Sequence, residues 1–172
     1  MFAKKTLPLH AKLIYSYKNM AKTEISTLGE FGLIKHLTKD FPTYQPSTQK
    51  AIGDDAAVLN HKDKRTLVTT DLLLEGIHFN LEYAPLKHLG YKAAVVNFSD
   101  IYAMNATPTQ ITVSLGISKR FAVEDLDELY AGIRLACERY NVDLVGGDTS
   151  ASMTGLTISI TCLGTAYDSD IV

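Results

Sequence analysis

The sequence predicts an α/β sandwich of the α+β kind, in which helices pack on one face of a mainly antiparallel mixed sheet. Short runs rich in Val, Thr and Ile alternate with longer segments of helical periodicity. The expected order is helix, strand, strand, helix, strand, helix, strand, strand, which is typical of two packed layers. The 172 residues are 46% hydrophobic and 21% charged, so the chain is long and apolar enough for one domain with a core.

The first regular segment begins at Thr23. In "TEISTLGEFGLIKHLTKDF" the apolar residues have helical spacing, and Pro42 follows the segment. The expected apolar face consists of Leu28, Phe31, Ile34 and Leu37. The next segment, "TYQPSTQK", is predicted to be a polar loop. "AAVLN" and "TLVTTDLLL", separated by "HKDKR", are predicted to be adjacent strands.

The second half repeats this alternation. "PLKHLGYKAAVVNFSDIYAMNA" predicts a helix and "TQITVSLGIS" a strand of period two. The clearest helix is "VEDLDELYAGIRLACERY", with acidic residues in its first turns, where the helix dipole favours anions. Its apolar stripe is Leu126, Leu129, Tyr130, Ile133, Cys137 and Tyr140. "VDLVGGDTS" predicts a buried strand ended by glycines, and "GLTISITCLGTA" a last strand.

Composition bounds the environment and the partners. Residues 1–22 are rich in Lys and lack an apolar run of signal-peptide length, so we expect a disordered extension before one domain at 23–172. A net charge of −2 without basic–aromatic patterning argues against nucleic acid. No run approaches the ~18 apolar residues of a membrane span. Cys137 and Cys162, without a CxxC neighbour, predict reduced buried thiols and a cytoplasmic protein.

Aspartates lie at the ends or in the apolar stretches of four separate elements. They are Asp54 and Asp55 in "AIGDDAAVLN", Asp71 in "TTD", Asp100 in "VVNFSD" and Asp148 in "LVGGD". Isolated carboxylates in such places are costly unless a cation neutralises them, and hard oxygen ligands suit Mg²⁺ bound to substrate phosphates. Thr69 and Thr70 add hydroxyl oxygens beside Asp71. A cap or a turn is the alternative for the aspartates, and a solvent-facing position for Asp100.

Two further residues and one glycine-rich string belong to this hypothesis. "GGDTS" could present backbone N–H groups to a phosphate. Because neither GxxxxGK[ST] nor GxGxxG occurs, metal bridging would have to replace the lysine of a P-loop. His78 follows the acidic strand end and is either a contact for an anionic substrate or an exposed loop histidine. Tyr130 is either a core residue or a base-stacking one.

Five strings, in this order, resemble the thiamine-monophosphate kinase family. They are "LGEFGLI" (28–34), "IGDDAAVL" (52–59), "TTDLLLEGIHF" (69–79), "YKAAVVNFSDIYAMNATP" (91–108) and "VGGDTS" (145–150). The resemblance implies ATP-dependent phosphorylation of thiamine monophosphate to thiamine diphosphate. It also implies a fold like the N-terminal domain of aminoimidazole ribonucleotide synthetase and a homodimer through the N-terminal sheets. The family's C-terminal domain is expected to be absent from this chain.

The resemblance also implies roles for individual residues. Asp55, Thr69, Thr70, Asp71, Asp100 and Asp148 match Mg²⁺ ligands, Tyr130, Gly147 and Asp148 match nucleotide contacts, and His78 matches a substrate contact. An acceptor phosphate is already ionised, so a direct metal-assisted transfer requires no strong general base. Two alternatives remain at this stage: another ATP-using enzyme of the same superfamily, and a non-catalytic Mg-nucleotide-binding or dimerisation module.

Overall fold

A mixed four-stranded sheet forms the centre of the molecule. The computed structural model describes residues 23–52 and 58–172. The sheet contains β3 (Arg65–Leu74), β4 (Thr107–Ile117), β5 (Asp143–Ala151) and β6 (Thr157–Ala166), in the order β3-β6-β4-β5. Strand β6 is antiparallel to both β3 and β4, whereas β4 and β5 are parallel. The predicted fold class is therefore confirmed, and β3 and β5 are the two edge strands of this sheet.

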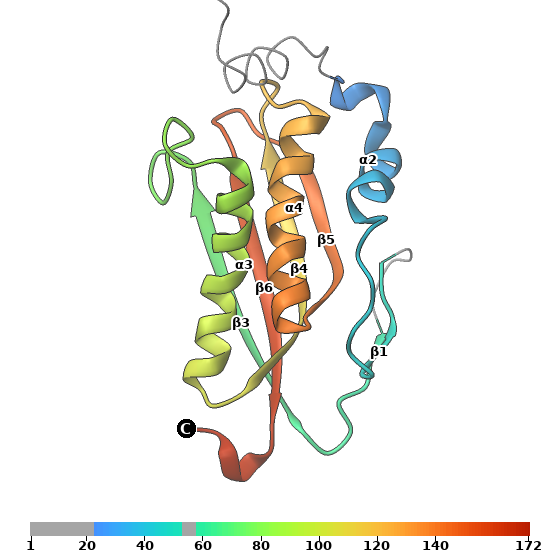
Figure 1. The fold of residues 1–172 in the computed structure, drawn as a ribbon, viewed down its shortest axis with the longest axis vertical. Helices are drawn as coiled ribbons and strands as arrows, with labels where there is room; N and C mark the ends of the chain where they lie inside the picture. The colour runs from blue at the N-terminus through green and yellow to red at the C-terminus, as the bar shows by residue number, and fades with distance from the viewer. Residues whose placement is uncertain (1–22, 53–57) are drawn as a thin grey trace, which may run out of the picture.

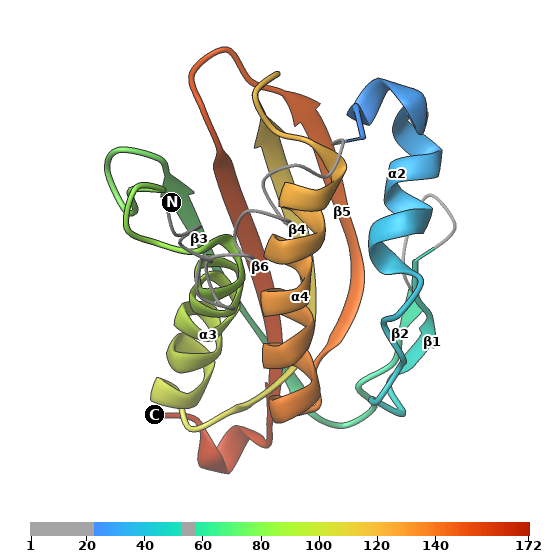
Figure 2. The same cartoon turned by 45° about the horizontal axis from the view of Figure 1, so that its top comes forward.

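Two long helices, α3 (Leu86–Ala103) and α4 (Val123–Tyr140), lie side by side on one face of the sheet (Figure 1). The shorter helix α2 (Gly29–Thr38) packs against α4, beyond the β5 edge (Figure 2). Single 3-10 turns, η1 (Ile25–Thr27) and η2 (Asp168–Asp170), precede α2 and follow β6. None of the helices in the described ranges has the length and hydropathy of a membrane span.

A small ribbon of two strands replaces one predicted strand pairing. β1 (Thr48–Lys50) and β2 (Val58–Leu59) pair with each other, so the predicted adjacency of β2 and β3 is wrong, and part of the predicted polar loop is a strand. The chain turns away after β2, where Lys62 adopts a left-handed conformation with φ 54°. At the free edge of β3, the Asp71 N–H binds the side chain of Asn97 instead of a strand.

The apolar stripe predicted for α4 is confirmed, whereas the apolar face predicted for α2 is wrong at Phe31. Five of the six predicted α4 positions are buried, and Tyr140 is partly buried. In α2 the buried residues are Leu33 and Leu37, whereas Phe31 is 84% exposed and was wrongly predicted to face inward. Phe31 precedes Leu33 by two positions and so points about 200° away around the helix. A hydrogen bond of 2.9 Å between His36 Nε2 and Asp127 Oδ1 fixes which face of α2 packs against α4.

Helices α3 and α4 touch through their backbones. A Cβ atom on Gly90 would lie 2.0 Å from the carbonyl oxygen of Leu129, and one on Gly132 would lie 1.9 Å from that of Lys87. Glycine in a helix interior costs roughly 0.5–1 kcal/mol relative to alanine. The close approach gives the physical reason for both glycines, because no side chain fits between the helices at these points.

We expect Gly132→Ala to destabilise the protein by about 1–3 kcal/mol, because the new methyl group collides with backbone that cannot move independently. Gly32→Ala in α2 is the matched control. Its Cβ would lie 3.5 Å from the Leu28 side chain, an ordinary contact, so stability should rise by roughly 0.4–1 kcal/mol. Urea unfolding of the two variants measures both effects. Equal changes in the two variants would show that the helices do not depend on this contact.

Candidate functional site

A row of polar contacts joins the edge strand β3 to helix α3. The Thr69 hydroxyl donates to Asp100 Oδ2 at 2.9 Å, and the Asp71 N–H donates to Asn97 Oδ1 at 3.1 Å. Further along, Lys92 Nζ donates to the carbonyl oxygen of His78 at 3.3 Å. We call this row the β3–α3 seam; its members are Thr69, Asp71, His78, Lys92, Asn97 and Asp100. The seam brings together residues that are widely separated in the sequence.

Asn97 organises the middle of the seam. Its side chain is fully buried, and its Nδ2 donates to the Ala93 carbonyl oxygen at 3.0 Å while its Oδ1 accepts the Asp71 N–H. An edge strand leaves such N–H groups without a strand partner, and a buried one is costly if it stays unpaired. Asn97 therefore fixes the backbone that carries the Asp71 carboxylate. Sequence reasoning missed it, although a single Asn inside the apolar run "AAVVNF" was a usable signal.

The seam offers hard oxygen ligands at one place. Thr69 and Asp71 occupy alternate positions of β3, so their side chains share the face covered by α3, and Asp100 lies exposed on that helix. A Mg²⁺ ion is commonly bound by one or two carboxylates together with substrate phosphates and water. Asp71, Asp100 and Thr69 supply the types of oxygen ligand that such a site uses.

The structure does not bring the other predicted ligands to the seam. Thr70 points to the opposite face, where its hydroxyl donates to the Ile160 carbonyl oxygen at 3.2 Å. Gly147 and Asp148 lie on β5, across the full width of the sheet from β3, about 14 Å away at the usual strand spacing. Within residues 23–52 and 58–172, no three His, Cys, Asp or Glu residues are grouped for a metal ion. Asp54 and Asp55 lie outside the described residues.

Asp148 is an exposed residue of β5, and the glycine before it is required by the packing of β5 against β4. Asp148 pairs with Ser114 in the register of β4 and β5, on the face away from the helices. A Cβ atom on Gly147 would lie 1.9 Å from the Val113 carbonyl oxygen. Glycine is thus needed here for the β4–β5 pairing, independently of any ligand.

His78 lies in the turn after β3 with one ring nitrogen in use. Its Nδ1 accepts a hydrogen bond from the Leu74 N–H at 3.0 Å, so the neutral ring carries its proton on Nε2. Glu75 anchors this turn by accepting the Leu156 N–H at 2.9 Å and by pairing with Arg120. The Arg120 hydrogen bond is the main cause that holds the pKa of Glu75 below its usual value. His78 therefore presents an N–H donor to solvent from a fixed turn.

Tyr130 lies in the core of the protein. The side chain is 8% exposed, and its ring makes an edge-to-face contact with Phe41 at 6.3 Å between centroids. Burial raises the pKa of Tyr130 to about 12. The helical stripe of α4 predicted this core position.

A buried carboxylate at the other edge of the sheet was not predicted. Asp143, the first residue of β5, is 1% exposed and accepts hydrogen bonds from the Tyr44 and Gln45 N–H groups and from the Thr48 hydroxyl. These three donors make four contacts that compensate its desolvation, and none of the three is a cation.

Gln110 of β4 extends this network to the far side of the β1–β2 ribbon. Its Nε2 donates to Ser47 Oγ at 2.8 Å and to Thr48 Oγ1 at 2.9 Å, and its Oε1 lies 3.1 Å from His61 Nε2. Together with Asp143 these contacts tie both flanks of the ribbon to the large sheet. The signals in the sequence were a lone acid in "NVDLV" and a lone amide in "TQITV".

Comparisons with known proteins agree with this architecture. The sequence matches the family described as AIR synthase related protein, N-terminal domain, over residues 53–166. The thiamine-monophosphate kinase of Synechococcus elongatus is 37% identical over 146 residues, which are 84% of this chain and 42% of that protein.

Two solved structures have the same fold over most of this chain. Thiamine-monophosphate kinase from Stenotrophomonas maltophilia K279a has a TM-score of 0.67 at 28% identity, covering 81% of this chain and 42% of that one. AaThiL complexed with AMPPCP and TMP has a TM-score of 0.58 at 35% identity, covering 84% and 44%. The chain thus spans less than half the length of the relatives it matches.

We expect Asp143→Asn to destabilise the protein by about 1–3 kcal/mol, because an amide offers one acceptor oxygen where several donors converge. Asp40→Asn, an exposed position after α2, makes the same chemical change as a control and should stay within about 0.5 kcal/mol of the parent. Thermal and urea unfolding measure both. A stability of Asp143→Asn equal to that of the control would contradict the structural role of this carboxylate.

Proposed function

The chain belongs to the AIR synthase related family, whose N-terminal domain it matches over residues 53–166, and from this premise we propose the activity. The chain is the Mg²⁺- and nucleotide-binding half of an enzyme that transfers a phosphoryl group from ATP to thiamine monophosphate, giving thiamine diphosphate. The curated relatives at 33–39% identity are thiamine-monophosphate kinases, and the 35% identical AaThiL was solved with AMPPCP, an ATP analogue, and TMP. These likenesses supply the substrate class.

The observation that carries this proposal is the β3–α3 seam. Asp71 and Asp100 hold one Mg²⁺ ion, with the Thr69 hydroxyl beside Asp100 and Asn97 fixing the backbone of Asp71. Bound there, Mg²⁺ offsets the repulsion between the two anionic substrates and orients their phosphates. The exposed Nε2–H of His78 donates to the phosphate of the acceptor.

The remaining assignments extend the site beyond the seam. Asp55, Thr70 and Asp148 are proposed as further Mg²⁺ ligands, and Gly147, Asp148 and Tyr130 as nucleotide contacts. Asp148 and Gly147 would act at a separate part of the site, since they lie on the opposite edge strand. A contact from Tyr130 requires the packing around its buried ring to open. The buried, unpaired thiols of Cys137 and Cys162 support a cytoplasmic location.

We also propose that two copies associate through their sheets. On the face opposite α3 and α4, the side chain of Val68 is 65% exposed and that of Leu72 is 52% exposed. Apolar side chains gathered on a sheet face without helices favour burial against another protein surface. A second copy of the same face would cover them in a symmetric, self-complementary contact.

The test of the proposed function is calorimetric titration with AMPPCP, with and without Mg²⁺, followed by an assay for thiamine diphosphate from thiamine monophosphate and Mg·ATP. Mg²⁺-dependent binding together with product supports the kinase. Binding without product supports a nucleotide-binding module that needs further chain for catalysis. Product from a different acceptor, with none from thiamine monophosphate, would identify another ATP-using enzyme of the family.

In the same titration we expect Asp71→Asn and Asp100→Asn each to weaken Mg²⁺-dependent AMPPCP binding by about tenfold or more, or 1.4 kcal/mol, while circular dichroism stays unchanged. Each variant replaces a charged ligand by a neutral one of the same shape. Asp63→Asn, in the exposed turn before β3, is the control and should bind as the parent does. If either seam variant kept parental affinity, that carboxylate would not be a Mg²⁺ ligand.

For the sheet interface, we expect Leu72→Glu to convert a dimer into a monomer, since two like charges would face each other across a dimer axis. Sedimentation velocity measures the change. Phe31→Glu places the same charge on an even more exposed apolar position of α2 and should leave the dimer intact. A parental chain that sediments as a monomer at every concentration would refute association through the sheets.

A further inference from the structure

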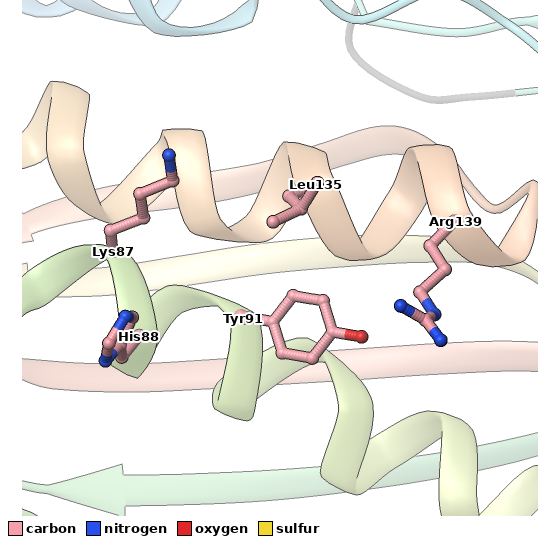
Figure 3. A pocket seen from close by; sticks show the side chains of 5 residues that line it. All are labelled: Lys87, His88, Tyr91, Leu135 and Arg139. Carbon is pink, nitrogen blue, oxygen red and sulfur yellow. The ribbon is translucent and has the colours of Figure 1, made fainter.

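A groove of about 360 Å³ lies between α3 and α4 on the outer side of the helix layer, away from the sheet. It is lined by Lys87, His88 and Tyr91 from α3 and by Leu135 and Arg139 from α4. The Tyr91 ring lies across the groove with its hydroxyl on the Arg139 side (Figure 3). The volume falls in the lower part of the ~300–1,000 Å³ range typical of small-molecule sites.

The groove is lined by two cations, Lys87 and Arg139, and by one histidine, His88. Among the described residues, no carboxylate forms an ion pair with Lys87, His88 or Arg139, although these side chains are exposed. Other arginines of the chain are paired: Arg65 with Asp168, Arg120 with Glu75 and Arg134 with Glu138. In a protein of net charge −2, this concentration of unpaired positive charge makes the groove a favourable place for an anion.

The fold adds to the positive potential at one end of the groove. Lys87 and His88 lie in the first turn of α3, which contains no acidic residue and has no side-chain cap. The partial positive charge of the helix N-terminus therefore reinforces the two side chains. The helix N-terminus thus adds to the positive charge of Lys87 from α3 and Arg139 from α4.

Apolar surface lies between the charges. Leu135 is 47% exposed, and the Tyr91 ring is partly buried. The groove lies beside the close contact at Gly132, and this contact holds the two helices at a fixed separation. Positive charge at both ends and an aromatic–aliphatic floor form a surface that suits a ligand with an anionic group and an apolar body.

We propose that the α3–α4 groove binds a small organic anion, a phosphate ester or a carboxylate joined to an aromatic or aliphatic body. The site is separate from the β3–α3 seam, because Asn97 and Asp100 contact β3 on the sheet side of α3 and Lys92 contacts the turn after β3. Arg139 binds the anionic group, Lys87 at the other end of the groove adds positive potential, and Tyr91 and Leu135 contact the apolar body. This inference does not depend on the chemistry proposed for the seam.

The test is an amide NMR titration of the whole chain with phenyl phosphate and with benzoate, which distinguish the two anionic groups. Inorganic phosphate and phenol serve as controls that carry the anionic group and the aromatic ring of phenyl phosphate separately. We expect phenyl phosphate or benzoate, at millimolar concentrations, to shift amides of residues 87–91 and 135–139. Inorganic phosphate and phenol alone should bind at least fivefold more weakly.

Substitutions assign the contacts. Arg139→Gln should weaken the stronger probe fivefold or more and Lys87→Gln should weaken it by a smaller factor, while Arg134→Gln should leave its affinity unchanged. Arg134 lies on the same helix but pairs with Glu138, so it is a matched loss of one positive charge. Heat-unfolding curves confirm that the variants remain folded.

Three outcomes would overturn the groove as a ligand site: no shift at the groove amides with either probe, equal binding of inorganic phosphate and phenyl phosphate, or equal weakening by Arg134→Gln. A parallel titration with Mg·AMPPCP separates this result from the kinase proposal. Shifts at Thr69 and Asp71 with unchanged groove amides would support the seam alone, whereas groove shifts with phenyl phosphate and none at the seam would support the groove alone.

Discussion

The backbone contact of α3 with α4 at Gly90 and Gly132 determines how the helix layer lies on the sheet. Because the helices meet without intervening side chains, neither can rotate or slide without a collision between main chains. With α4 held over the sheet by its buried stripe, α3 is fixed over β3 and β6. Asn97 and Asp100 then reach β3 at hydrogen-bond distance, so the proposed Mg²⁺ site depends on a contact that lies outside it.

Both edges of the sheet use buried polar side chains to satisfy backbone groups. At β3, Asn97 binds the Asp71 N–H. At the β5 edge, Asp143 and Gln110 bind the loop of residues 44–48 and His61, and thereby attach the β1–β2 ribbon. Edge strands carry free donors and acceptors that invite unwanted pairing. Here a side chain occupies the Asp71 N–H at the β3 edge, and the attached ribbon lies against the β5 edge through β1.

Sequence patterns predicted the elements whose stability is local, and missed features that depend on distant contacts. The α4 stripe and the alternation of β6 are visible within one segment, so both were predicted correctly. Asn97 acts on a residue 26 positions away and Asp143 on one 95 positions away, and no periodicity indicates such partners. The prediction that β2 lies beside β3 was wrong for the same reason, since β2 pairs with β1. Phe31 was misplaced because several apolar residues of α2 allow more than one helical face.

The charged residues of α3 are arranged in an order that helix stability does not explain. In α4, Glu124 and Asp125 lie in the first turn and Arg139 in the last, the order that the helix dipole favours. Helix α3 has the reverse order, with Lys87 and His88 in its first turn and Asp100 in its last. The charges of Lys87 and Asp100 oppose the dipole, and a sequence selected for helix stability alone would place them differently. Such local conflicts are expected where binding takes precedence over stability. The Thr69 hydroxyl partly compensates Asp100, and a bound cation there and a bound anion in the groove would each complete the compensation.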